Sequence, residues 1–108
     1  MAIAEDLLTT TVSLAPSRAT IGVSGELDAY TSPRLRDAAS KAMCPDMSLI
    51  VDLAEVTFID SVGLGTLISL AKEVRDRDGE FYLRRPPPSV RRLLEITGLS
   101  EALTSTAP

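Results

Sequence analysis

Residues 48–65 read SLIVDLAEVTFIDSVGLG, and this stretch predicts the fold class. Four of its first six residues are apolar and do not alternate, which is typical of a strand covered on both faces in a parallel sheet. After residues 56–59, which read VTFI, the segment 60–65 has the residue types of a helix start. A buried strand that leads directly into a helix is the repeating unit of α/β folds, so we expect a mainly parallel sheet.

Downstream, the apolar residues take a helical spacing and then return to a short strand. We expect a helix that begins at Ser61 and ends at Asp78 and Gly79, followed by a strand at 81–83. The prolines at 86–88 open a last helix, which Gly98 ends. The side chains expected to face the core from these two helices are Leu64, Leu67, Ile68, Ala71, Val74, Val90, Leu93, Leu94 and Thr97.

Upstream, two alternating segments precede another helix. Residues 7–14 and 19–25 alternate around a turn at 15–18, which predicts an antiparallel hairpin. Ser32 is the expected N-cap of the next helix, and Pro33 is its expected first residue. The predicted order is therefore β-β-α-β-α-β-α, a single small α/β domain with a mostly parallel mixed sheet and helices packed against it. The side chains expected to form the helical stripe are Leu35, Ala38, Ala39, Ala42 and Met43.

The 108 residues suit one domain, and we expect its core to span about 7–103, with a flexible tail at 104–108. The N-terminus reads MAIAEDLL, which has neither the positive nor the apolar region of a signal peptide. The chain also lacks the run of about 18 apolar residues that spans a membrane. We therefore expect a cytoplasmic protein that does not bind a membrane.

The composition excludes several classes of function. The chain has no histidine, so the commonest general base, metal ligand and pH sensor is missing. Cys44 is the single cysteine and cannot form an internal disulfide. The net charge of −4 argues against nucleic acid, because duplex binding depends on Lys and Arg that meet phosphates. We expect no metal, no cofactor, no nucleic-acid partner and no enzymatic activity.

Ser61 is the candidate functional residue. It follows the buried strand, at the edge where open α/β sheets bind ligands. We expect it to be the N-cap of its helix, beside free backbone N–H groups, which puts Leu64 at the third helical position instead of a capping glutamate. Gly63 and Gly65 each weaken a helix by about 0.5–1 kcal/mol relative to alanine, which favours a surface that another molecule approaches closely. A serine that only caps the helix is the simpler alternative.

A phosphate on Ser61 would act on binding and not on folding. It would add about −1.5 to −2 charges, which the dipole and free N–H groups of a helix N-terminus tolerate. Asp60, together with Asp28 and Asp52, would oppose the added charge. We therefore expect phosphorylation to leave the fold intact and to abolish contacts that need a neutral surface.

Two motifs resemble those of the STAS domains of bacterial anti-sigma factor antagonists. The first is Gly25-Glu26-Leu27-Asp28, and the second is FIDSVGLG at 58–65. Later elements of the same pattern are SVRRLL at 89–94 and TGL at 97–99. The resemblance covers nearly the whole chain.

This resemblance implies a partner switch. In the family, the serine after the motif's aspartate is phosphorylated by a protein that is both anti-sigma factor and serine kinase. The unmodified form binds that partner and frees the sigma factor, and a protein phosphatase resets the cycle. ATP and its metal belong to the kinase, so this chain needs no cofactor, and we expect a monomer. The implied phosphorylation site is Ser61, and the implied partner-binding residues are Asp28, Asp60, Ser61, Val62, Gly63 and Leu64.

The sequence departs from the family pattern at two points. Val62 stands where a second Ser or Thr often follows the phosphorylated serine, which removes an alternative acceptor and makes the surface more apolar. The chain also ends soon after Leu99, whereas many relatives have another helix there. We expect this difference to leave one flank of the sheet less covered, or covered by a partner.

Other functions stay open at this point. STAS domains also occur in stress-signalling scaffolds and lipid-transport assemblies, where the partner differs. A serine hydrolase would need G-x-S-x-G around Ser61, but Ile59 replaces the first glycine. A cluster of basic residues could bind nucleic acid or an acidic partner, although we expect a solvated surface there. That cluster consists of Arg84, Arg85, Arg91 and Arg92.

Overall fold

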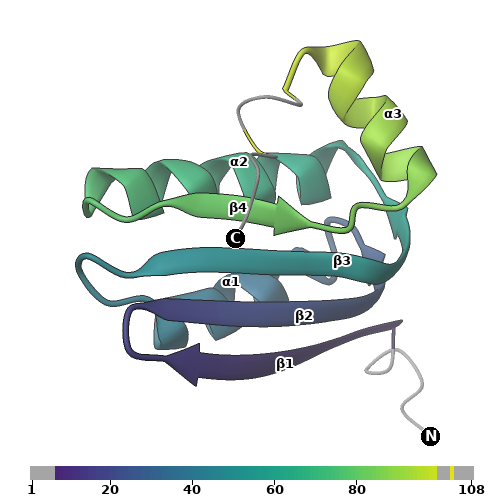
Figure 1. Ribbon diagram of the computed structural model, residues 1–108. Helices are drawn as coiled ribbons and strands as arrows, with labels where there is room; N and C mark the ends of the chain where they lie inside the picture. Colours follow the sequence, from purple (N-terminus) through teal and green to yellow (C-terminus); the bar gives the residue numbers. More distant parts are fainter. Residues whose placement is uncertain (1–6, 100–102, 104–108) are drawn as a thin grey trace, which may run out of the picture.

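The computed structural model describes residues 7–99 and residue 103, and Figure 1 shows their arrangement. Strands and helices follow one another in the order β-β-α-β-α-β-α, which confirms the predicted order. The elements are β1 (Leu8–Ala15), β2 (Arg18–Leu27), α1 (Ser32–Ala42), β3 (Ser48–Ile59), α2 (Ser61–Asp76), β4 (Phe81–Arg84) and α3 (Pro88–Thr97). The expected tail at 104–108 lies outside the described residues.

The four strands form one mixed sheet in the order β1-β2-β3-β4. β1 and β2 pair antiparallel through the turn at 16–17, whereas β2, β3 and β4 run parallel to one another. The hairpin and the parallel part of the sheet are therefore both confirmed. The β2–β3 pairing contains two register shifts, and Asp52 Oδ1 accepts a hydrogen bond of 3.0 Å from Ala54 N–H at the first of them.

Helices α1 and α2 cover one face of the sheet, and α3 lies beyond the β4 edge (Figure 1). The expectation that the β3 strand is covered by helices on both faces was wrong, because no helix of the described chain lies on the opposite face (Figure 1). Ile50 is nevertheless fully buried there, since it lies between Thr20 of β2 and Tyr82 of β4. The core on the helical face includes Leu27, Leu35, Leu49, Leu53, Leu67, Leu70, Phe81, Val90 and Leu94.

Helix α1 begins one residue earlier than expected. Thr31 is its N-cap and Ser32 is its buried first residue, because Ser32 N–H already donates to the Asp28 carbonyl at 2.8 Å. At the other end of the chain, Gly98 ends α3 in the left-handed conformation, with φ of 76°, as expected. Leu99 N–H then donates to the Leu94 carbonyl at 2.9 Å, which completes the cap.

Two predicted core positions are more exposed than expected. Thr97 is exposed, and its hydroxyl donates to the Leu93 carbonyl at 2.8 Å instead of facing the core. Ile68 keeps 38 % of its surface exposed, because α2 turns Leu67 and Leu70 toward the sheet. A helical stripe in the sequence shows which side chains point toward the sheet. It does not show how far the sheet extends, so burial at the margin of the stripe is not predicted.

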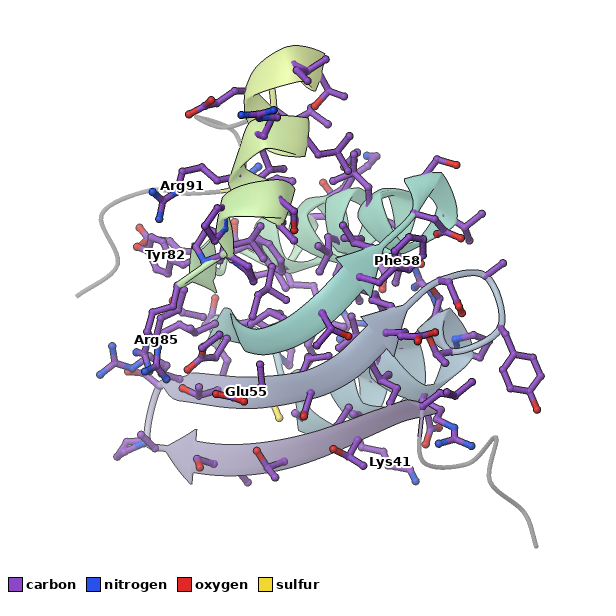
Figure 2. The ribbon with its side chains drawn as sticks, turned by 90° about the vertical axis from the view of Figure 1, so that its right-hand side faces the viewer. Lys41, Glu55, Phe58, Tyr82, Arg85 and Arg91 are labelled. Carbon is purple, nitrogen blue, oxygen red and sulfur yellow. The ribbon has the colours of Figure 1, made fainter. Side chains whose placement is uncertain are left out.

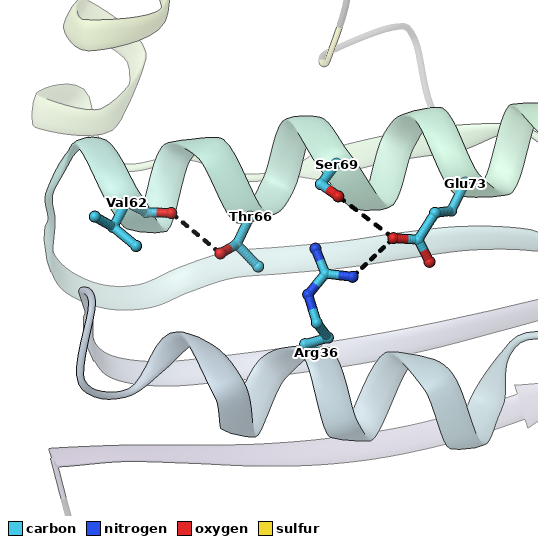
Figure 3. Close-up of polar contacts among 5 residues, drawn as sticks. All are labelled: Arg36, Val62, Thr66, Ser69 and Glu73. Carbon is cyan, nitrogen blue, oxygen red and sulfur yellow. Dashed lines mark hydrogen bonds and ion pairs between the residues drawn. The ribbon is translucent and has the colours of Figure 1, made fainter.

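An ion pair connects α1 to α2 beside the core. Arg36 Nη1 donates to Glu73 Oε2 at 2.7 Å, and the Ser69 hydroxyl donates to the same oxygen at 3.3 Å (Figure 3). The hydrogen bond from Arg36 lowers the pKa of Glu73 more than its slight burial raises it. The pair therefore stabilises the folded state only while Glu73 is ionised.

We expect Glu73→Gln to lower the free energy of unfolding at pH 7 by less than about 1 kcal/mol, because solvent screens a half-exposed pair. The folded pKa of Glu73 lies below its ordinary value of 4.5, so this contribution is present above that pH and is lost as the pH falls below it. Urea unfolding at several pH values measures the difference between the variant and the natural chain. Glu95→Gln, on an exposed part of α3, is the matched control. A difference that grows toward low pH would contradict the assignment.

Candidate functional site

The candidate site lies where β3 ends and α2 begins. Asp60 is the N-cap of α2, and its Oδ1 accepts a hydrogen bond of 2.8 Å from Gly63 N–H. The expectation that Ser61 is the N-cap was therefore wrong, and Gly63, not Leu64, is the third helical residue. The aspartate carboxylate reaches the same N–H that a serine cap would have used. This shift leaves Ser61 as the first residue of the helix.

Ser61 therefore does not cap the helix. Its side chain is exposed, and no described residue forms a hydrogen bond with its hydroxyl. Val62 beside it is 48 % exposed. In the same turn, the Thr66 hydroxyl donates to the Val62 carbonyl at 3.1 Å (Figure 3). An unengaged hydroxyl at the surface is accessible to an enzyme that modifies it.

Gly63 and Gly65 have different reasons to be glycine. A Cβ on Gly63 would lie 2.4 Å from the carbonyl oxygen of Leu27, so the protein's own β2 approaches the helix backbone there. The close approach expected from another molecule is therefore made by this chain at Gly63. Gly65 is exposed, and no heavy atom lies within 4 Å of the Cβ that it lacks. Only Gly65 remains open to an incoming partner.

Asp28 holds the loop that lies against this turn. Its Oδ1 accepts hydrogen bonds from Tyr30 N–H at 2.9 Å and Thr31 N–H at 3.0 Å. The Thr31 hydroxyl donates to the Glu26 carbonyl at 2.7 Å and accepts from Asp28 N–H at 2.9 Å. Asp28 therefore shapes the loop at 28–31, which continues from the strand end that contacts Gly63.

The structure brings most of the predicted site residues to the place where β2 and β3 end and α2 begins, which we call the Ser61 edge. Asp60 N–H donates to the Leu27 carbonyl at 3.2 Å, so the Asp28 loop and the start of α2 are adjacent. Among the predicted partner-binding residues, Gly63 and Leu64 are buried, and they hold the turn from within. Ser61 and Val62 are exposed, whereas Asp28 and Asp60 are half-buried and accept hydrogen bonds from the backbone.

Sequence reasoning missed two aromatic residues at this edge. Tyr30 is 66 % exposed on the Asp28 loop, and Phe58 is 50 % exposed near the end of β3, where it pairs with Glu26 (Figure 2). Large exposed aromatic side chains are typical of protein interfaces. The signal in the sequence was an aromatic residue two positions from the aspartate of each motif, Tyr30 after Asp28 and Phe58 before Asp60.

The basic cluster lies on a different surface. Arg85 pairs with Asp52 Oδ2, and Tyr82 and Arg85 project from the face of the sheet that carries no helix (Figure 2). Burial raises the pKa of Asp52, but the hydrogen bonds from Arg85 and Ala54 N–H and the charges of Arg85 and Arg84 outweigh it, so the pKa lies below its ordinary value. Arg85 is thus engaged in holding the β2–β3 register shift, which supports a structural role for it.

Neither a metal centre nor a membrane span is found in the described part of the chain. No group of three or more potential metal ligands gathers among residues 7–99 and 103. None of the helices described is long and apolar enough to cross a bilayer.

Comparison with known proteins gives consistent results. The model of the STAS domain family matches residues 12–107. An anti-sigma-B factor antagonist from Listeria monocytogenes is 39 % identical over 84 residues, which cover 77 % of this chain and 74 % of that protein. A solved anti-sigma factor antagonist from Mycobacterium paratuberculosis is 31 % identical, with a TM-score of 0.76 over 91 % of this chain and 84 % of that one. Phosphorylated SpoIIAA from Bacillus, at 22 % identity, shares the fold with a TM-score of 0.71 over 92 % of each chain.

We expect Gly63→Ala and Gly65→Ala to have opposite effects on stability. The first places a methyl group against the Leu27 carbonyl, which cannot move without displacing β2, so we expect a loss of about 2 kcal/mol or more. The second fills open space in a helix and should gain up to about 1 kcal/mol. Urea unfolding of the two variants measures both effects. Equal losses for the pair would contradict the close approach at Gly63.

Proposed function

The chain belongs to the STAS domain family, and from that premise we propose that it is an anti-sigma factor antagonist switched by phosphorylation of Ser61. In this proposal the unmodified chain binds an anti-sigma factor that is also a serine kinase, and so frees a sigma factor in the cytoplasm. Phosphorylation ends the binding, and a protein phosphatase restores it. The observation that carries the proposal is the exposed Ser61 hydroxyl, on a helix whose cap is supplied by Asp60.

The geometry supports a modification that spares the fold. Because Asp60 caps α2 through Gly63 N–H, the Ser61 side chain can gain a phosphate without breaking a hydrogen bond of the cap. The new charge stands in the first turn of a helix, where the dipole is favourable to anions. The core side chains of the same turn point inward and keep their contacts. A phosphate on Ser61 would therefore leave the contacts that stabilise this turn intact.

The same geometry supports a strong effect on binding. Tyr30, Phe58 and Val62 are exposed apolar side chains at the edge of the sheet that carries Ser61. A neutral partner surface that covers them would also have to cover the phosphate. Burying about −1.5 to −2 charges without a cationic partner costs several kcal/mol, and the adjacent Asp60 carboxylate adds repulsion. We therefore infer that phosphorylation releases the partner.

Ser61 acts in this proposal as an acceptor and not as a nucleophile in catalysis. The chain offers no histidine to remove its proton. The kinase partner brings the ATP and the metal ion for phosphoryl transfer. We infer that this chain has no catalytic activity of its own.

We expect Ser61→Ala to keep partner binding and to be insensitive to ATP, and Ser61→Asp to fold normally but bind at least about tenfold more weakly, because even one added charge must be desolvated. The experiment incubates the chain with each candidate anti-sigma factor kinase of the same genome and ATP. Peptide mapping by mass spectrometry then locates any added phosphate, and calorimetry measures the affinity of each variant.

The control for Ser61→Asp is Ser17→Asp, in the exposed turn between β1 and β2 at the opposite end of the strands. Equal affinity of Ser61→Ala and Ser61→Asp for a kinase that phosphorylates the natural chain would overturn the switch. Phosphate found only at another residue would overturn the assignment to Ser61.

We expect Tyr30→Ala and Phe58→Ala each to weaken binding of the unmodified chain by about tenfold, because truncating a buried aromatic anchor at an interface typically costs more than 1 kcal/mol. Leu14→Ala is the matched control, since Leu14 is 69 % exposed and pairs with Ala19 at the start of β2, at the opposite end of the strands from Ser61. Calorimetry against the kinase identified above measures the affinity of each variant. A larger loss from Leu14→Ala would place the interface elsewhere.

A further inference from the structure

The two edges of the sheet differ in how they avoid pairing with other strands. β4 is an edge strand of four residues and ends in Arg84. β1, at the other edge, has eight residues that read LTTTVSLA, with no charged residue, no proline and no register shift against β2. Short length, charge, proline and bulges are the usual protection of an edge strand. β4 has two of these features, whereas β1 has none.

A groove runs along the unprotected edge, between β1 and α1. It has a volume of ≈ 650 Å³, and Val12 and Leu14 remain 46 % and 69 % exposed beside it. These two side chains alternate in step with the buried Leu8 and so share its face of β1, but α1 does not cover them. The apolar lining comes from Leu8, Val12, Leu14, Ala38 and Ala42. β1 therefore presents to the same neighbour both an apolar strip and a side that pairs with no described strand.

The charges at the rim of this groove complement themselves under a twofold axis. Asp37 and Lys41 lie one turn apart on α1 and both line the groove, where Figure 2 shows Lys41 beside β1. Within one chain they form an exposed ion pair of 3.1 Å, which two copies can exchange for pairs between chains. Arg34 Nη1 donates to the Leu8 carbonyl at 3.1 Å, which holds the start of α1 against the start of β1. If two β1 strands pair antiparallel, the two α1 helices also become antiparallel. Asp37 of each copy then faces Lys41 of the other, with the small Ala38 between them.

We propose that β1 pairs antiparallel with β1 of a second copy, to give a dimer with a continuous eight-stranded sheet. The unpaired edge supplies the hydrogen bonds, the groove buries Val12 and Leu14, and the Asp37–Lys41 contacts select the antiparallel arrangement. This dimer replaces the monomer expected from the sequence. The surface shares no lining residue with the Ser61 edge, so the inference stands independently of the proposed function.

Sedimentation equilibrium of the full chain tests the proposal over the micromolar range. We expect a concentration-dependent dimer, and a dissociation constant at least about tenfold higher for Val12→Lys and Leu14→Lys, whose exposed positions tolerate a charge. Ile96→Lys, an equally apolar position on α3, should dimerise like the natural chain. A monomer throughout the range, or a dimer that survives both groove variants, would overturn the proposal.

A mixing experiment tests the twofold arrangement without any change to β1. Asp37→Lys puts positive charges at both 37 and 41, and Lys41→Asp puts negative charges at both, so each variant alone should dimerise more weakly than the natural chain. An equimolar mixture should form the heterodimer in preference to either homodimer, which native mass spectrometry resolves. Statistical mixing of the two variants would show that these residues do not face each other. Far-ultraviolet circular dichroism confirms that each variant is folded.

Discussion

The close approach of the Leu27 carbonyl to the backbone of Gly63 is the constraint on which the site depends. A Cβ at residue 63 would come within 2.4 Å of that oxygen, so β2 and α2 can meet in this way only at a glycine. The contact sets the start of α2 against the ends of two neighbouring strands. Asp60, whose N–H donates to the same carbonyl, is thereby placed to cap the helix. Ser61 becomes the first residue beyond the cap, with its side chain outside.

This arrangement divides the segment 61–64 into an inner and an outer half by physical role. Gly63 and Leu64 face the core and are needed for the junction, whereas Ser61 and Val62 face solvent and contribute little to it. In the proposed function, a charge added to the outer half therefore lowers the affinity for a docking partner more than it lowers the stability of the fold. Asp28 has a similar double position, because its carboxylate shapes the loop that presents Tyr30.

The open sheet gives the molecule separate surfaces with separate chemistry. The Ser61 edge combines acidic and aromatic side chains, which suits a protein partner whose affinity depends on the charge of this surface. The face without helices holds the Asp52–Arg85 pair. The lowered pKa of Asp52 keeps its carboxylate ionised at the β2–β3 register shift. The β1 strand has no charged residue, and the groove beside it has an apolar floor with charged residues of α1 at its rim. Because none of these surfaces overlaps another, association at one need not block another.

The sequence alone was sufficient for the order of elements, the hairpin and the Gly98 cap. These follow from periodicity and from the backbone preferences of single residues, which are local. It was not sufficient for the cap of α2, the reason for Gly63, or the exposure of Val12, Leu14 and Thr97. The position where the preceding strand ends decides which of two adjacent polar residues caps a helix. The size and position of the opposite element decide how deeply an apolar face is buried. Both are set by contacts between segments distant in the chain, so only the tertiary structure decided them.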